Sequence, residues 1–282
     1  MLKLLIEQAK SKLLKNIVEI FSQQKEIYNI SVFGREVGGK ADRYSDIDII
    51  ICTDDLAKTQ KYYKQKLSTI SPILGNYFLR LEDTEIVEMI LLKGISPYNK
   101  IDLSISNNLA GKSEFSPFKK LYCREGKGPS CSTKIRTNVK YSKNINMLHD
   151  RLFSIPRFTK TLFRDEQQET YRRWQATINE YLKILMRKYL SYVPEKQLHP
   201  IAFKNLKDKI NRNDSNKMKM ILPAANNFSI GNSYKLAMHE ITKYYLAKIS
   251  TYPYREFYNT MMQFLNEEID RFYNGKSGKN VY

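Results

Sequence analysis

Three aspartates stand in sequence contexts that suit metal-assisted chemistry. Asp46 and Asp48 are two residues apart at the start of the apolar run Ile47–Cys52, so the pleat of a strand would project both carboxylates to one side. Asp102 alternates with the apolar residues of 101–105 and would leave the apolar face of its own strand. Carboxylates held close together repel unless a cation binds between them, and Mg²⁺ prefers such oxygen ligands. The three aspartates therefore predict a site for two Mg²⁺ ions, an arrangement that supports nucleotidyl transfer from a triphosphate to a hydroxyl.

A glycine-bearing loop leads into the first two aspartates. Gly34 directly follows a predicted strand, and a residue without Cβ allows a triphosphate to approach the backbone amides closely. Gly39 permits the return turn of the same loop. The loop is therefore predicted to bind the phosphates of the nucleotide.

The elements that must position these residues alternate between helical and strand periodicity. Apolar residues recur at three- and four-residue spacing over 2–22, and the helical pattern returns over 56–70. Runs rich in β-branched residues predict strands at 27–33, 47–52, 77–82, 86–92 and 100–106. This order predicts an α/β domain with a mixed sheet.

The sequence changes character after residue 110. Polar residues and a Gly-Pro turn cluster dominate the segment that follows, which we interpret as a connector. Strand patterns are absent beyond 145, and helical stripes of apolar residues run through 171–189 and 257–272. The predicted domains are an α/β domain at 1–110 that holds the three aspartates, a connector at 111–144 and an all-α domain at 145–282.

Some residues have two interpretations. Glu88 shares a strand face with Ile86 and Ile90 and would act as general base if Asp102 is purely a metal ligand, but an edge-strand surface charge is the favoured interpretation. Trp174 and Tyr181 lie at helical spacing and are interpreted as core residues rather than as a platform for stacking bases.

Charge is divided unevenly along the chain. Residues 1–110 hold 15 basic and 14 acidic residues, whereas residues 111–282 hold 32 and 15 and carry a net charge of +17. A basic region can attract RNA or a nucleoside triphosphate. The equal alternative is a solvated helix surface, because the chain is rich in Lys, Asn, Ile and Tyr throughout.

The composition predicts a cytoplasmic protein that does not contact a membrane. No apolar run approaches the ~18 residues of a membrane helix, and the segment 1–21 carries charges where a signal peptide would be apolar. The three cysteines are too few and too scattered for a disulfide framework.

Residues 31–50 resemble the signature of the nucleotidyltransferase fold shared by DNA polymerase beta and the antibiotic nucleotidyltransferases. The resemblance rests on Gly34, on the pair Asp46 and Asp48, and on Asp102 of a later strand, and it covers roughly residues 27–106. Arg35 departs from the family, which usually has Ser or Gly after the glycine; arginine can instead grip phosphate through two hydrogen bonds. The nucleotide-binding residues that the resemblance implies are Gly34, Arg35, Gly39 and Ser45.

The resemblance also implies an activity. The segment 118–126 and the helical second half loosely resemble bacterial aminoglycoside 6-adenylyltransferases. This resemblance implies that 1–110 is the catalytic domain and 145–282 a substrate-binding domain, with the active site in the cleft between them. The leading expectation is a Mg²⁺-dependent enzyme that moves AMP from ATP to a hydroxyl of a small molecule such as an aminoglycoside or lincosamide antibiotic. The alternative is transfer to RNA 3′ ends or synthesis of a nucleotide signal, and a third interpretation is a binding protein without catalysis. The sequence gives no indication of the oligomeric state.

Overall fold

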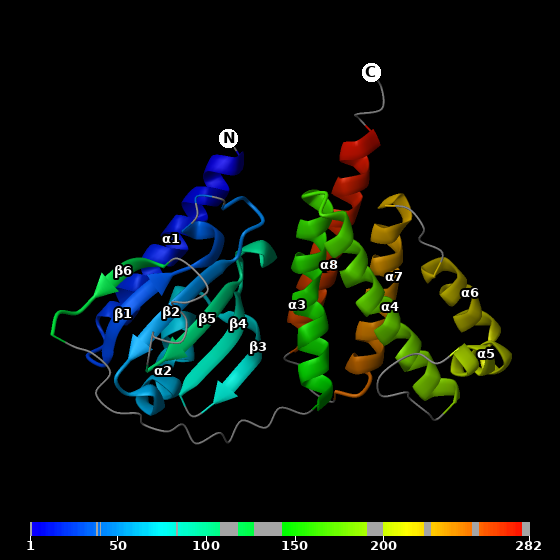
Figure 1. The fold of residues 1–282 in the computed structure, drawn as a ribbon, viewed down its shortest axis with the longest axis horizontal. Helices are drawn as coiled ribbons and strands as arrows, with labels where there is room; N and C mark the ends of the chain where they lie inside the picture. The colour runs from blue at the N-terminus through cyan, green and yellow to red at the C-terminus, as the bar shows by residue number, and fades with distance from the viewer. Residues whose placement is uncertain are drawn as a thin grey trace. The chain divides into compact units, whose positions relative to one another are not determined.

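The chain divides into two compact units, Met1–Ser142 and Lys143–Tyr282 (Figure 1). The computed structural model describes residues 2–37, 39, 41–82, 84–107, 118–126, 143–190, 200–222, 227–249 and 254–277. Most of the predicted connector 111–144 lies outside the described residues.

The first unit is built on a six-stranded mixed sheet with the strand order β3-β4-β5-β2-β1-β6. The strands are β1 (Ile27–Val32), β2 (Ile47–Thr53), β3 (Ile73–Glu82), β4 (Glu85–Leu92), β5 (Ile101–Ser106) and β6 (Lys119–Cys123). β2 and β5 run parallel, while the other neighbouring pairs are antiparallel. The predicted mixed α/β architecture is confirmed.

Helices α1 (Leu2–Ser22) and α2 (Leu56–Ile70) pack on one face of this sheet. Their apolar stripes form a single core with the alternate strand residues that point toward them. Its buried members include Leu13, Ile17, Phe21, Tyr63 and Leu67 from the helices and Ile47, Ile49, Ile51, Leu103 and Ile105 from the strands. Because side chains alternate along a strand, Asp48 and Asp102 project to the opposite face.

Strand β6 lies inside the segment interpreted as a connector. It pairs antiparallel with β1, and Leu121 and Tyr122 pack against the core. Lys119 and Lys120 are exposed, as suits an edge strand. Because two of its five residues are exposed lysines, β6 lacks the apolar alternation that predicts a strand. The sheet extends beyond the predicted domain boundary at residue 110.

The described part of the second unit is entirely helical, which confirms the predicted all-α architecture. Its helices are α3 (Lys143–Phe163), α4 (Gln167–Tyr189), α5 (Pro200–Lys209), α6 (Arg212–Ile221), α7 (Asn227–Leu246) and α8 (Tyr254–Ser277). Trp174 and Tyr181 are buried, and the Trp174 indole N–H donates to Ser233 Oγ at 2.8 Å. Their interpretation as core residues is correct. Among the described helices, none is both long and apolar enough to span a membrane.

Candidate active site

The three aspartates lie on neighbouring strands and share one face of the sheet. Asp48 and Asp102 are directly paired in the parallel register of β2 and β5. Asp46 immediately precedes β2 and lies two residues before Asp48, so its side chain points the same way. The parallel pairing thus brings together carboxylates that are far apart in the sequence, on the face opposite α1 and α2.

A lysine binds two of these carboxylates. Lys100 Nζ donates to Asp46 Oδ2 at 2.9 Å and also to Asp102 Oδ1. The Lys100 side chain is only 2% exposed, against about a fifth for each aspartate. Asp46 and Asp102 are therefore close enough to share one cation. Sequence reasoning overlooked Lys100, although its position two residues before Asp102 would have placed it on the same face.

Asp48 has a different neighbour, the backbone of Gly34. Phe33 N donates to the Asp48 carbonyl oxygen at 3.2 Å, which holds the end of β1 against β2. Gly34 has a φ of +70°, and a Cβ atom on it would collide with the Asp48 carboxylate. Glycine is required here both for its backbone conformation and for the space that Asp48 occupies.

The other predicted nucleotide-binding residues surround the same loop. Ser45 is buried, and its hydroxyl donates to Asp42 Oδ1 at 2.9 Å and accepts from Asp42 N at 3.0 Å. Lys10 Nζ of α1 donates to the Ser45 carbonyl at 3.1 Å, so the turn before Asp46 is tied to a helix. Gly39 has a φ of +63°, and Arg35 is exposed. Contact of these residues with a nucleotide stays a prediction.

Glu88 is excluded from this site, and neither interpretation of it was correct. In the β4–β5 register Met89 pairs with Asp102, so Glu88 projects to the opposite face, toward α2. It is fully buried and accepts hydrogen bonds from Tyr63 and Asn76, with Lys64 Nζ at 2.8 Å. Burial raises the pKa of its carboxyl above the ordinary value of 4.5, against the opposing effect of Lys64.

The donor set suits a hard divalent cation, although the described residues contain no ready-made group of three metal-ligating side chains. Asp46 and Asp102 converge on the Lys100 ammonium, and Asp48 lies against Gly34. Carboxylate oxygens are among the ligands that Mg²⁺ prefers, and Asp46 and Asp102 are close enough together to bind one cation. The three aspartates therefore fit Mg²⁺, provided that the ammonium leaves.

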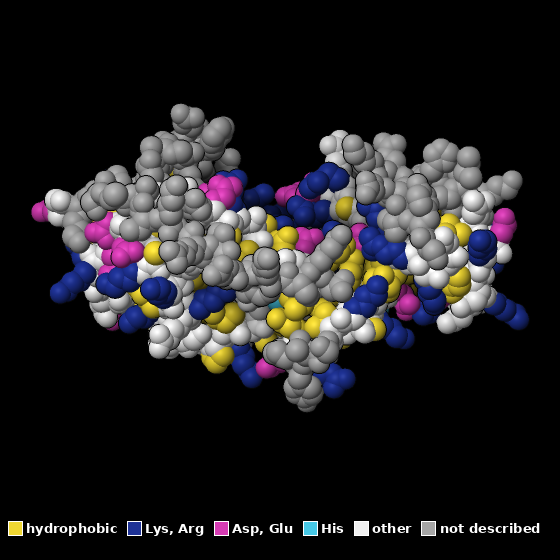
Figure 2. Space-filling view, turned by 90° about the horizontal axis from the view of Figure 1, so that it is seen from below, with side chains coloured by type: hydrophobic (Ala, Val, Ile, Leu, Met, Phe, Trp, Pro, Cys, Tyr) yellow, Lys and Arg dark blue, Asp and Glu magenta, His cyan; other side chains and the backbone are white. Residues whose placement is uncertain are grey.

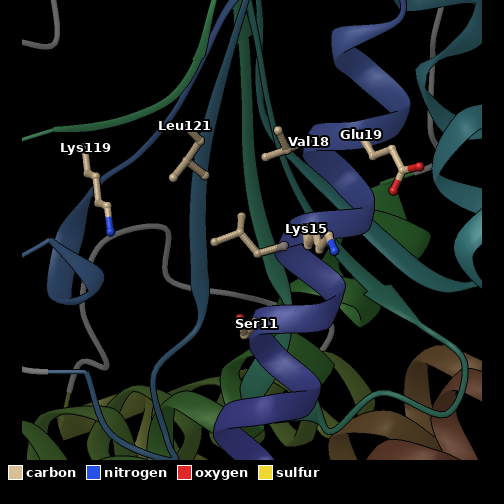
Figure 3. A pocket seen from close by; sticks show the side chains of 7 residues that line it. Ser11, Lys15, Val18, Glu19, Lys119 and Leu121 are labelled. Atoms are coloured by element: carbon tan, nitrogen blue, oxygen red, sulfur yellow. The ribbon is translucent and has the colours of Figure 1, made fainter.

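A surface groove of about 680 Å³ lies elsewhere, between α1 and β6 (Figure 3). Ser11, Leu14 and Lys15 line it from the helix, with Lys119 and Leu121 from the strand. Leu14 and Leu121 pack against the core beneath α1, so the groove is on the helix-covered side of the sheet. It is separate from the aspartate site.

Comparison with known proteins finds little. No family model and no curated protein matches the chain. Among solved structures, a STING-associated CdnE c-di-GMP synthase from Capnocytophaga granulosa is similar at 12% sequence identity, with 95% of this chain and 80% of that chain covered and a TM-score of 0.25. A TM-score this low does not establish a common fold.

Proposed function

We propose that the chain is a metal-dependent nucleotidyltransferase. The proposal rests on the positions of the three aspartates. Asp46 and Asp102 both accept hydrogen bonds from the Lys100 ammonium. Asp48 pairs with Asp102 in the sheet and lies against Gly34. Clustered carboxylates that can hold divalent metal ions are what metal-assisted phosphoryl transfer requires.

Each residue has a distinct part in the proposed reaction. Asp46, Asp48 and Asp102 would hold two Mg²⁺ ions, which neutralise the triphosphate and lower the pKa of the attacking hydroxyl. The turn at Gly34 offers backbone amides to the phosphates of ATP, and Arg35 adds a guanidinium. Since Glu88 faces away, Asp102 is the proposed acceptor of the hydroxyl proton.

The acceptor is proposed to be anionic. Residues 111–282 carry a net charge of +17, which repels a cationic aminoglycoside and attracts a phosphate-bearing molecule. A nucleotide hydroxyl therefore suits this chain better than an antibiotic hydroxyl, and synthesis of a nucleotide signal becomes the favoured form of nucleotidyl transfer. A lincosamide or aminoglycoside acceptor is the competing candidate.

The test of nucleotidyl transfer is substitution of a single carboxylate. Asp48→Asn should lower the rate of labelled AMP transfer from ATP by about 10³ or more, with an unchanged melting temperature, because removing one of several like charges does not destabilise the fold. Asp270→Asn is the matched control, since Asp270 is an exposed α8 carboxylate paired with Lys235 at 3.3 Å. Near-normal turnover in Asp48→Asn would refute the catalytic assignment.

The acceptor is tested by offering several hydroxyl compounds to the same preparation. ATP labelled in the α-phosphate would be incubated with Mg²⁺ and, separately, with nucleotides, aminoglycosides, lincosamides or tRNA. Labelled products are separated by thin-layer chromatography. A product with nucleotides supports the anionic acceptor, whereas a product formed only with an antibiotic shows that the net charge does not select the acceptor.

A further inference from the structure

Lys100 buries a positive charge at the centre of the proposed metal site. Its side chain is 2% exposed, and burying an ammonium is costly unless it is paired and hydrogen-bonded. Lys100 donates to two carboxylates that the proposed reaction needs for metal, those of Asp46 and Asp102. The lysine therefore stabilises the two carboxylates by pairing with both of them.

The ammonium and a divalent ion compete for the same oxygens. Asp46 Oδ2 lies 2.9 Å from Lys100 Nζ, and Asp102 Oδ1 is in direct contact with the same nitrogen. Two cations held this close repel strongly, all the more so where water is largely excluded. Metal binding to the free chain thus has to break two charge-assisted hydrogen bonds and expel a lysine.

We propose that Lys100 is an internal counter-ion that keeps Asp46 and Asp102 from binding a divalent metal until a nucleoside triphosphate is present. The inference rests on the proposed function for the identity of the site. A triphosphate brings negative charge that offers a new partner to the displaced ammonium, and it supplies further oxygen ligands to the metal. Metal and nucleotide should accordingly bind together, with strong positive coupling, rather than metal first.

Mn²⁺ binding measured without nucleotide tests the idea directly. Free Mn²⁺ is counted by electron paramagnetic resonance during titration of the full chain, using wild type, Lys100→Gln and Lys58→Gln. Lys58 is the matched control because it forms an ion pair with the buried Glu26 at 3.0 Å, away from the aspartates. Lys100→Gln should bind Mn²⁺ at least about tenfold more tightly than wild type. Equal affinities of wild type and Lys100→Gln would overturn the proposal.

Thermal stability gives a second readout that does not depend on activity. In excess chelator, Lys100→Gln should melt at a lower temperature than wild type, because Asp46 and Asp102 then repel each other. Mn²⁺ should restore the melting temperature of this variant while leaving that of wild type almost unchanged. A variant whose melting temperature is insensitive to Mn²⁺ would show that Lys100 is not a stand-in for metal.

A third test uses only the wild-type chain, so its result cannot be caused by misfolding of a variant. A non-hydrolysable ATP analogue should increase the Mn²⁺ affinity of wild type by at least about tenfold. Equal Mn²⁺ affinity with and without the analogue would contradict the proposal. Absence of AMP transfer, with the Mn²⁺ results as expected, would instead refute the proposed function and leave the role of Lys100 standing.

Discussion

The carboxylate of Asp48 lies where a side chain on Gly34 would be. Gly34 also has a positive φ, so two separate penalties apply to any other residue at this position. One penalty is backbone strain, and the other is displacement of a proposed metal ligand. A substitution that carries only the first penalty separates the two.

Gly34→Ala is expected to lose at least about a hundredfold in transfer rate and about 1–3 kcal/mol in the free energy of unfolding. Gly94→Ala is the matched control, because Gly94 has a φ of +74° with open space around its Cβ position. It should show a similar loss of stability in urea titrations but normal transfer. Equal losses of transfer in both variants would mean that strain alone is responsible.

The positions of the three aspartates could be predicted from the sequence better than those of the charged residues near them. Asp46, Asp48 and Asp102 stand on one face because strand alternation decides the direction of each side chain. Lys100 and Glu88 were harder to assign, since a charged residue beside an apolar strand usually faces water. The side of the sheet to which Glu88 points follows only from the register of β4 against β5, in which Met89 rather than Glu88 pairs with Asp102.

At the level of elements, α2 is fixed to the sheet by a buried polar cluster. Tyr63 and Lys64 of α2 contact Glu88 of β4, which also accepts a hydrogen bond from Asn76 of β3. Lys64 lies over the ring of Phe78 at 4.4 Å. A carboxylate with three partners at the centre of this contact makes the docking of α2 sensitive to the charge on Glu88.

The raised pKa of Glu88 predicts how this contact responds to pH. Burial favours the neutral carboxyl in the folded chain, so its contribution to stability is fully present below about pH 4.5, the unfolded value, and is lost as pH rises through the folded pKa. Glu88→Gln cannot ionise. The free energy of unfolding of wild type should therefore fall relative to that of Glu88→Gln when urea titrations are repeated at pH 4, 5.5 and 7. A relative rise would show that the Lys64 ion pair outweighs burial.

In the first unit the helices and most strands follow from the periodicity of the sequence, and β6 is the strand that does not. The helices predicted at 2–22 and 56–70 have the same bounds as α1 and α2. Strand β6 was missed because Lys119, Lys120 and Cys123 are exposed and only Leu121 and Tyr122 are partly covered. An edge strand with so little burial lacks the alternation on which the prediction depends, and only its pairing with β1 reveals it.

At the scale of the molecule, the net charge of +17 over residues 111–282 and the arrangement of basic side chains on one face bear on the acceptor. Figure 2 shows Lys and Arg side chains at many separate places on the face it presents, with Asp and Glu side chains among them. A long polyanion such as RNA needs a continuous track of basic groups to neutralise its phosphates. On this face the basic side chains are interspersed with acidic ones, which suits a small anion that meets only a few of them.

Salt dependence therefore distinguishes the acceptors. Binding of a nucleotide acceptor should weaken by less than about tenfold between roughly 50 and 200 mM salt, through screening alone. An RNA acceptor that contacts about six or more phosphates would lose about 10³ in affinity over the same range. Filter retention of labelled tRNA and of labelled nucleotide at several salt concentrations gives both slopes. A steep slope for tRNA would favour the RNA acceptor.

Buried tyrosines predict that the folded chain is sensitive to alkali. Burial raises the pKa of Tyr234 to about 12; its ring stacks on Phe158 and its hydroxyl hydrogen-bonds with Ser154 Oγ at 3.0 Å. Because the folded pKa lies above the unfolded value of 10.0, the stabilisation is complete below pH 10 and is lost as pH rises toward 12.

Tyr234→Phe should remove this contribution, which is on the order of 2 kcal/mol. Melting temperatures measured at pH 9, 10.5 and 11.5 should fall less steeply for Tyr234→Phe than for wild type. Tyr171→Phe is the control, since Tyr171 is 49% exposed, and it should follow wild type. Parallel curves for Tyr234→Phe and wild type would contradict the prediction.

The parallel pairing of β2 with β5 determines when the aspartate site can assemble in the nascent chain on the ribosome. α2 and the antiparallel β3–β4 pair lie between these strands in sequence, so the contact between Lys100 and Asp46 closes a span of 54 residues. Bringing the two ends of such a span together lowers the entropy of the chain before the contacts between β2 and β5 can stabilise it. The hairpin of β3 and β4 forms from local contacts, but the aspartates meet only after β5 has been synthesised and docked. A chain interrupted during translation before β5 therefore carries Asp46 and Asp48 without their partner strand and has no assembled site.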